Sequence, residues 1–441
     1  MNTWNLETIF SGGTKSQELQ TKLTDIHKHI NEYQSLLTNW NHHPKSVDTF
    51  KTILHKQETI ENGLSQAATF VQMWHDAYMN DEHANVVKGQ IMELYSEVQK
   101  ATNTFTKQIV EIAEEDWQQL LEEDKDLSEV AFALNEIRNK GKRLLSEDEE
   151  ELIAELNKDG LAAWSDLYDT VVSIMTIPFT DNEGNTTELS VGQAMNRMYA
   201  DPDPKVRKQI FENWEAAWSK NGPIFADILN HLDGYRITLQ NKHQYQHHLE
   251  EPLEYNRMTE DSLNAMWSAV ANNKQPFLDF ISQKAKLLGM EKLGWQDVDA
   301  PIALGDVKPT DFTYDQACDF VIDNFASFGP KLADFAKHAL ENRWVEAENR
   351  PNKRPGGYCT SLPEFSESRI FMTFTGSSSD TSTLAHELGH AFHSHVMKDL
   401  PALNRNYAMN VAETASTFAE TIINNATIKN AKSEEEKIAL L

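Results

Sequence analysis

The chain has few of the residues that cross-link small secreted proteins or interrupt helices. It contains 2 cysteines among 441 residues, too few for a disulfide framework, and we expect Cys318 and Cys359 to be free thiols. Its 18 glycines and 14 prolines are about 7% of the chain, where about 12% is usual. Because both residues break helices, their scarcity predicts a mainly α fold.

Positive charge and long apolar runs are also scarce. The chain has 40 basic and 68 acidic residues, a formal net charge of −28, which argues against nucleic acid or an anionic membrane surface as a partner. No run approaches the roughly 18 apolar residues of a transmembrane helix, and no basic region followed by an apolar stretch opens the chain. We therefore expect a cytoplasmic protein with no membrane partner, and the sequence leaves the oligomeric state open.

One segment of the sequence contains side chains that can bind a metal ion and transfer protons. His386 and His390 lie four residues apart, with Glu387 beside the first. On a helix the two imidazoles would lie about 6 Å apart along the axis and on one face, where both can reach one metal ion. Glu387 is rotated by about 100°, which places it beside a metal-bound water. This is the H-E-x-x-H pattern of zinc peptidases.

The surroundings of the motif favour a real helix over a chance pair among 16 histidines. Asp380, Thr381 and Ser382 are candidate N-caps, an apolar stripe runs through the segment, and Pro401 prevents its continuation. We expect a helix over roughly 380–398.

A catalytic zinc site normally has three protein ligands, so a third must be found. Glu413 lies in a helix-like run 23 residues after His390, far enough for a turn and a second helix that passes the metal. His393 is the alternative, since it shares the face of His386, but it lies about 10.5 Å along the axis and is better placed beside the site than on the ion. His395 points away from that face.

Several segments together resemble a known family, the oligoendopeptidase F branch of the thimet-oligopeptidase-like zinc metallopeptidases. The similar segments are His386–Ala391, Asn410–Ser416, Trp4–Gly13, Leu145–Trp164 and Lys353–Tyr358. The first is the specific one. The resemblance implies one Zn²⁺ per chain held by His386, His390 and Glu413, with Glu387 as the general base and acid. It also implies a large, helical, two-lobed, zincin-like body with a deep channel, and short unfolded oligopeptides as substrates.

Helical patterns recur along the chain, and the domain boundaries that they indicate are approximate. Apolar residues spaced alternately by four and three predict one long helix: Leu19, Leu23, Ile26, Ile30, Tyr33, Leu37 and Trp40. Ser146 with Glu149 predicts a capping box, and Asp203-Pro204 predicts another helix start. We expect an N-terminal helical region over 1–115, a helical domain of the oligoendopeptidase N-terminal type over 116–195, and a catalytic peptidase domain over 196–441.

A β-favouring run, Arg369–Gly376, precedes the motif and predicts a small β element beside the active site. An edge strand there could pair with an extended peptide through main-chain hydrogen bonds. We therefore expect substrate binding along Phe371, Met372, Thr373 and Phe374, or else a buried strand without that role. The resemblance adds Gly356, Gly357 and Tyr358, which by pattern alone form a turn. Asp380 and Glu420 are candidate carboxylates behind the ligands, although a helix cap and a solvated side chain explain them equally well.

These features favour a zinc metalloendopeptidase that cleaves internal bonds of short oligopeptides through a zinc-activated water. The alternatives are a catalytically impaired peptide-binding protein and another zinc hydrolase such as an aminopeptidase. Ser433 and Glu436 predict one more helix just before the chain stops. Because the resemblance implies further sequence with tyrosine and histidine side chains that stabilise the oxyanion, we expect the C-terminal part of the fold to be missing and the activity of this chain to be reduced.

Overall fold

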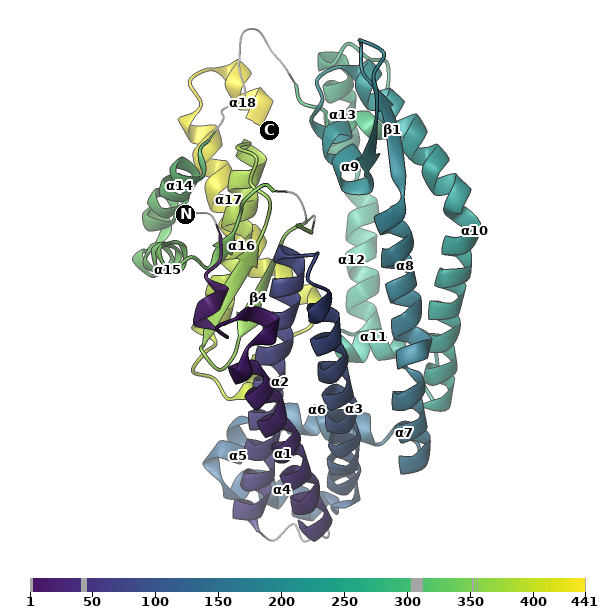
Figure 1. Ribbon diagram of the computed structural model, residues 1–441, viewed down its shortest axis with the longest axis vertical. Helices are drawn as coiled ribbons and strands as arrows, with labels where there is room; N and C mark the ends of the chain where they lie inside the picture. The colour runs from purple at the N-terminus through teal and green to yellow at the C-terminus, as the bar shows by residue number, and fades with distance from the viewer. Residues whose placement is uncertain (1–2, 41–45, 303–311, 351–352, 355, 441) are drawn as a thin grey trace. The chain divides into compact units, whose positions relative to one another are not determined.

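The computed structural model describes residues 3–40, 46–302, 312–350, 353–354 and 356–440, and the side chains of all of these except 439 and 440. The described chain is mainly helical with two small sheets (Figure 1), as its composition predicts. It forms two compact units. Unit 1 comprises Met1–Glu155 and Thr310–Asn424, and unit 2 comprises Leu156–Pro309 and Asn425–Leu441.

The first part of unit 1 is built on three long helices that pack on one another (Figure 1). Its helices are α1 (Gln17–Trp40), α2 (Val47–Ala77), α3 (Glu82–Glu111), α4 (Glu114–Glu123), α5 (Lys125–Glu129), α6 (Ala131–Gly141) and α7 (Glu147–Leu156), preceded by the 3₁₀ turns η1 (Leu6–Thr8) and η2 (Gly13–Lys15). All seven residues of the predicted apolar stripe are buried in α1, which confirms that helix. At the start of α7, Ser146 N–H donates to Glu149 and Glu149 N–H donates to Ser146 Oγ, which confirms the capping box.

The second part of unit 1 joins four helices to a three-stranded sheet. The elements are α14 (Tyr314–Phe328), α15 (Pro330–Glu341), β3 (Val345–Glu346), β4 (Tyr358–Leu362), β5 (Glu367–Phe371), α16 (Ser378–Val396), the 3₁₀ turn η5 (Ala402–Arg405) and α17 (Met409–Asn430), whose last turns belong to unit 2. The sheet separates two cores. Phe371 and Leu362 face the core of the N-terminal helices, whereas Ile370 and Met372 face the core that contains α16.

The order of the sheet corrects one expectation. The predicted strand forms as β5, but β5 lies in the centre, parallel to β3 and antiparallel to β4. The amides of Met372 and Phe374 continue this pairing by donating to Glu346 and Ala347. A parallel partner 25 residues upstream cannot be recognised from the local pattern, so the expectation of an edge strand at Phe371–Phe374 was wrong. Among the described strands, β3 and β4 each have a single neighbour, so both are edge strands, and β4 is the longer of the two.

Unit 2 is helical with one hairpin. It contains the π-helical turn η3 (Lys158–Ala162), α8 (Ala163–Ile174), β1 (Thr176–Thr180), β2 (Thr186–Ser190), α9 (Val191–Ala200), α10 (Pro204–Lys242), α11 (Glu250–Tyr255), α12 (Glu260–Asn272), α13 (Gln275–Leu287), the 3₁₀ turn η4 (Trp295–Asp297) and α18 (Glu434–Leu440). Asp203 caps α10 by accepting from Lys205 N–H at 2.8 Å, as predicted. The buried pair Arg207–Asp297, 2.8 Å apart, ties α10 to η4.

Two further expectations concern the state of the cysteines and the domain boundaries. Cys318 and Cys359 are free thiols, as predicted. The domain boundaries expected at 115 and 195 stay predictions, and the compact units each combine segments distant in sequence. Within the described residues, none of the helices combines the length and the apolar character needed to span a bilayer.

Candidate metal centre and active site

The helix that carries the motif begins earlier than the sequence predicted. Ser377 is the N-cap of α16, and its hydroxyl accepts from Asp380 N–H at 3.0 Å in a capping box. Asp380 Oδ2 in turn accepts from the amides of Thr375, Gly376 and Ser377 at 2.8–3.0 Å. The Asp380 carboxylate is therefore occupied by the loop that enters α16. These hydrogen bonds fix the start of the helix.

Two imidazoles and one carboxylate converge between α16 and α17. The rings of His386 and His390 lie 5.0 Å apart at 80°, one turn apart on α16. Glu413, near the start of α17, places Oε2 at 3.2 Å from Nε2 of each histidine. These three donor atoms all lie within 4.8 Å of one another. A tetrahedral zinc ion with bonds of about 2.0–2.2 Å needs donor atoms about 3.3–3.6 Å apart, so the set fits a zinc ion.

The close approach of α16 and α17 depends on Gly389. A Cβ at this position would lie 2.7 Å from the carbonyl oxygen of Ala415 and 2.8 Å from Cα of Ser416. No side chain fits between backbones that close, so glycine is required one residue before His390. The crossing brings the first turns of α17, and with them Glu413, to the two histidines.

Two further side chains hold the ligands in place. Glu420 Oε2 lies 3.3 Å from Nδ1 of His386, and a hydrogen bond from that N–H leaves Nε2 as the nitrogen that faces Glu413. The hydroxyl of Ser416, which is fully buried, donates to Glu413 Oε2 at 2.7 Å. This hydrogen bond is the main cause that lowers the pKa of Glu413, so the carboxylate is ionised and suited to bind a cation. The structure thus brings Glu420 to the position proposed for it, and adds Ser416, which the sequence analysis did not identify.

Glu387 has the environment of a proton carrier. Its side chain is buried, and Oε2 has no hydrogen-bond partner among the described residues. Burial raises the pKa of Glu387 to about 7, the nearby His386 lowers it, and Glu413 raises it. A buried carboxylate oxygen without a partner is costly, and such groups are concentrated at functional sites.

The other histidines of α16 are not part of the ligand set. The ring of His393 packs 4.7 Å from the ring of Tyr407, and burial lowers its pKa. His395 packs against Phe335, with ring centroids 4.8 Å apart. Among the described residues, the group whose donor atoms converge consists of His386, His390 and Glu413. That neither His393 nor His395 binds the metal stays a prediction.

The residues expected to bind substrate are distributed over two strands. Gly357 lies directly beside the Glu387 carboxylate, since a Cβ placed there would be 3.5 Å from Glu387 Oε1. Tyr358 opens the edge strand β4, stacks on Phe371 at 5.2 Å and 13°, and donates its hydroxyl to Asp76. Phe371 and Met372 are buried, and Phe374 packs on Tyr314, so these side chains belong to the two cores on either side of the sheet. Gly356 and Thr373 flank these positions in the sequence.

Lys353 supports this region and was not identified from the sequence. Its side chain is 2% exposed, and its ammonium donates to the carbonyls of Glu346, Glu348 and Met372 at 2.6–3.2 Å. Burial lowers the pKa of Lys353 to about 8, and Glu346 opposes that change. Because the three carbonyls lie on β3, on the following loop and after β5, Lys353 fixes the start of the loop that leads to Gly357. A lysine two residues before Pro-Gly-Gly in the sequence shows no pattern that would predict such burial.

Comparison with known proteins places the chain among peptidases. Residues 197–441 match the model described as Peptidase family M3, and residues 108–177 match the one described as Oligopeptidase F. The oligopeptidase PepF of Bacillus subtilis (strain 168) is 26% identical over 450 residues, covering 100% of this chain and 64% of its own length. The group B oligopeptidase PepB of Streptococcus agalactiae serotype III (strain NEM316) is 24% identical over 447 residues, covering 99% and 71%. The chain therefore spans about two thirds of these relatives.

Solved structures show the same fold. A structure titled PZ peptidase A with inhibitor 2 has a TM-score of 0.74 at 17% identity and covers 94% of this chain and 70% of its own. Oligoendopeptidase-F from Enterococcus faecium has a TM-score of 0.67 at 16% identity, with 96% and 70% covered. At these identities the likeness concerns the fold.

Proposed function

The chain belongs to peptidase family M3, and from this membership we propose that it is a zinc metalloendopeptidase that hydrolyses internal peptide bonds of short oligopeptides. The observation that carries the proposal is the convergence of His386, His390 and Glu413 beside the buried carboxylate of Glu387, whose Oε2 has no hydrogen-bond partner among the described residues. Two neutral imidazoles, one carboxylate and an adjacent base are the side chains that zinc-dependent hydrolysis requires.

Each side chain has a distinct part in the proposed reaction. His386, His390 and Glu413 would hold one zinc ion per chain, and zinc when bound makes water acidic near neutral pH and polarises a carbonyl group. Glu387 would accept a proton from the attacking water and return it to the leaving amine, for which its unpartnered Oε2 is free. Glu420 would keep His386 in the correct tautomer and orientation.

The substrate is proposed to bind as an extended strand. The edge strand β4 starts one residue after Gly357, and Gly357 adjoins Glu387. A peptide paired with β4 through main-chain hydrogen bonds would pass the catalytic carboxylate regardless of most of its side chains. Such recognition suits short unfolded peptides of varied sequence. Gly356, Gly357 and Tyr358 then belong to the substrate site, whereas Phe371, Met372, Thr373 and Phe374 support it from the neighbouring strand.

Hydrolysis of end-blocked peptides tests the proposal against its alternatives. We expect cleavage of internally quenched peptides with blocked termini, its loss in the presence of a chelator, and its recovery on addition of zinc. An aminopeptidase would cleave only peptides with a free amino terminus, and an impaired binding protein would bind peptides without cleaving them. Zinc content measured on the same samples shows whether inactivity reflects a missing metal. A cytoplasmic location stays a prediction that cell fractionation can test.

A further inference from the structure

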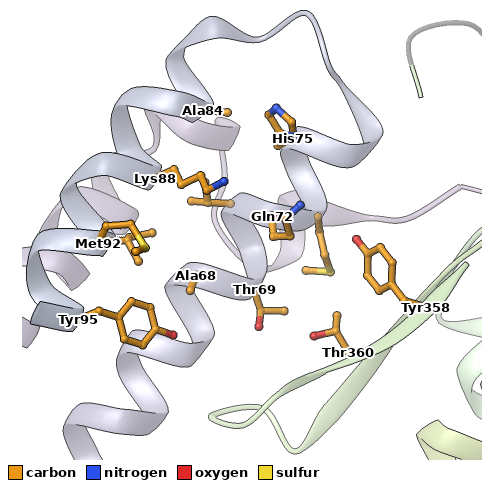
Figure 2. Close-up of a pocket in the computed structure, with 13 residues that line it drawn as sticks. Ala68, Thr69, Gln72, His75, Ala84, Lys88, Met92, Tyr95, Tyr358 and Thr360 are labelled. Atoms are coloured by element: carbon orange, nitrogen blue, oxygen red, sulfur yellow. The ribbon is translucent and has the colours of Figure 1, made fainter. Parts of the chain in front are cut away.

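A cavity of about 300 Å³ lies between α2, α3 and the edge strand β4 (Figure 2). All three elements belong to unit 1. Its walls are mostly apolar: Met73 from α2, Ile91, Met92 and Tyr95 from α3, and Tyr358 from β4. Met73 and Ile91 are buried, whereas Met92 and Tyr95 are 42% and 41% exposed, so the cavity opens to solvent along α3.

The cavity borders the strand on which the peptide is proposed to lie. Tyr358 and Thr360 line it, and both project from the same face of β4 because side chains alternate along a strand. Gly357, the residue before Tyr358, adjoins the Glu387 carboxylate. At about 3.3 Å per residue, Tyr358 and Thr360 lie one and three positions from the point where the scissile bond would be.

We propose that this cavity is a specificity subsite that takes one large apolar side chain of the bound peptide, one to three residues from the cleaved bond. The inference rests on the proposed function, because it assumes a peptide paired with β4. A peptide strand in that register directs alternate side chains to the face of Tyr358 and Thr360, and therefore into the cavity. The hydroxyl of Tyr358 is held by Asp76 and its ring by Phe371, so this wall is preformed.

The chemistry of the walls selects the side chain. Methionine thioethers adapt to the shape of a ligand and make favourable contacts with aromatic rings. Met73, Met92, Tyr95 and Tyr358 therefore suit phenylalanine, leucine or methionine. Lys88 also lines the cavity but is exposed, so its ammonium remains hydrated and creates little preference for an acidic side chain.

Filling the cavity tests the proposal. Thr69 borders it from α2 (Figure 2) and is half-buried, so Thr69→Phe would occupy the space, and Met92→Trp would do so from α3. Thr52→Phe is the matched control, because Thr52 is exposed on the same helix and does not line the cavity. Each protein is first compared by thermal unfolding and zinc content, so that a folding defect in one variant leaves the other as the test.

The substrates are end-blocked polyalanine peptides in which phenylalanine or glutamate replaces alanine at one position at a time. For wild type and Thr52→Phe we expect kcat/KM to rise about tenfold or more when phenylalanine occupies one particular position. In Thr69→Phe and Met92→Trp this preference should disappear while the all-alanine peptide is still cleaved. An undiminished preference in both filled variants, or a preference for glutamate that Lys88→Ala removes, would overturn the subsite.

Binding separates failure of the subsite from failure of the proposed function. The same peptides, labelled with a fluorophore, are titrated into zinc-loaded Glu387→Gln and into that protein with Thr69→Phe added. If no peptide is cleaved by wild type but phenylalanine still tightens binding only while the cavity is open, the function is wrong and the subsite holds. If peptides are cleaved and phenylalanine changes neither binding nor kcat/KM at any position, the function holds and the subsite is wrong.

Discussion

At the residue scale, the Glu413 carboxylate completes the group of three side chains proposed to bind zinc, together with two histidines one helical turn apart. Its Oε2 is equally close to both Nε2 atoms, and Ser416 donates to the same oxygen. The side chain is 52% exposed, so the structure holds it in place by these contacts and not by burial. A solvent-exposed glutamate without a binding role would not be expected to have its carboxylate fixed by three side chains.

Removing Glu413 should therefore abolish tight zinc binding. We expect Glu413→Ala to lose more affinity than the about 10–100-fold typical of an outer partner, because a direct ligand is removed. Zinc content after dialysis against a weak chelator measures this loss. His393→Ala is the control and should keep its zinc, because His393 packs on Tyr407 outside the ligand set. Equal zinc content in Glu413→Ala and wild type would place the third ligand elsewhere.

Glu387 should act on protons without binding the metal. Glu387→Gln keeps the size and polarity of the side chain but removes the base, so hydrolysis should fall by about 10²–10⁴-fold or more while zinc content stays unchanged. Peptide turnover and metal analysis on the same preparation check both parts. Loss of zinc from this variant would show that Glu387 is a ligand.

The roles of some residues can be predicted from their spacing in the sequence, whereas the roles of others depend on contacts formed by the fold. The relative positions of His386, Glu387 and His390 can be predicted from helical geometry. The position of Glu413 can be predicted from a second helix that turns back toward the two histidines. Lys353 and Ser416 are different, because their importance comes from contacts with carbonyls and a carboxylate that the fold brings from elsewhere. Asp380 shows the opposite case, since a carboxylate near the motif is occupied by a capping box three residues from the N-cap.

At the element scale, the crossing of α16 and α17 is set by the missing side chain of Gly389. Gly389→Ala should push the two backbones apart, destabilise the protein by about 1–3 kcal/mol and weaken zinc binding. Denaturant unfolding and zinc titration measure the two effects. Gly89→Ala is the matched control: Gly89 lies within α3 with open space where a Cβ would be, so alanine there should stabilise by about 0.5–1 kcal/mol.

An outcome in which Gly389→Ala and Gly89→Ala behave alike would show that the helices adjust without cost. The measured zinc affinity decides whether the crossing matters for the site: normal affinity in a destabilised Gly389→Ala would mean that Glu413 reaches the metal from a shifted helix.

Elements were easier to predict than their pairing. The α1 stripe, the capping box of α7 and the start of α10 follow from side-chain spacing and caps, which are local. The short strand β5 was recognised by its β-branched and aromatic residues, but its central place depends on β3 and β4, which have five residues or fewer. Strands as short as β3 and β4 show no hydrophobic periodicity in the sequence. The edge strand was therefore predicted at Phe371–Phe374, next to β4, which is an edge strand in the structure.

At the scale of the whole molecule, the proposed ligands and the substrate strand lie in one compact unit. His386, His390 and Glu413 all lie within Thr310–Asn424, and α2 and α3, which line the cavity, lie within Met1–Glu155. Unit 1 is therefore assembled from the two segments that flank most of unit 2 in sequence. Hydrophobic periodicity carries no information on such long-range association, so the sequence does not indicate which segments combine in each compact unit.

This arrangement predicts that zinc stabilises the two units unequally. Ligand binding stabilises the native state by about 2.7 kcal/mol at a hundredfold excess over Kd, and it slows only those amide exchange events whose opening breaks the site. Because all three ligands belong to unit 1, hydrogen exchange with and without a chelator should show zinc-dependent protection, of about a hundredfold, in α16, the first turns of α17 and the β3–β5–β4 sheet. Exchange in α8–α13 should be unchanged. Glu413→Ala should show no zinc-dependent protection in either unit, and equal protection of both units in wild type would contradict a site confined to unit 1.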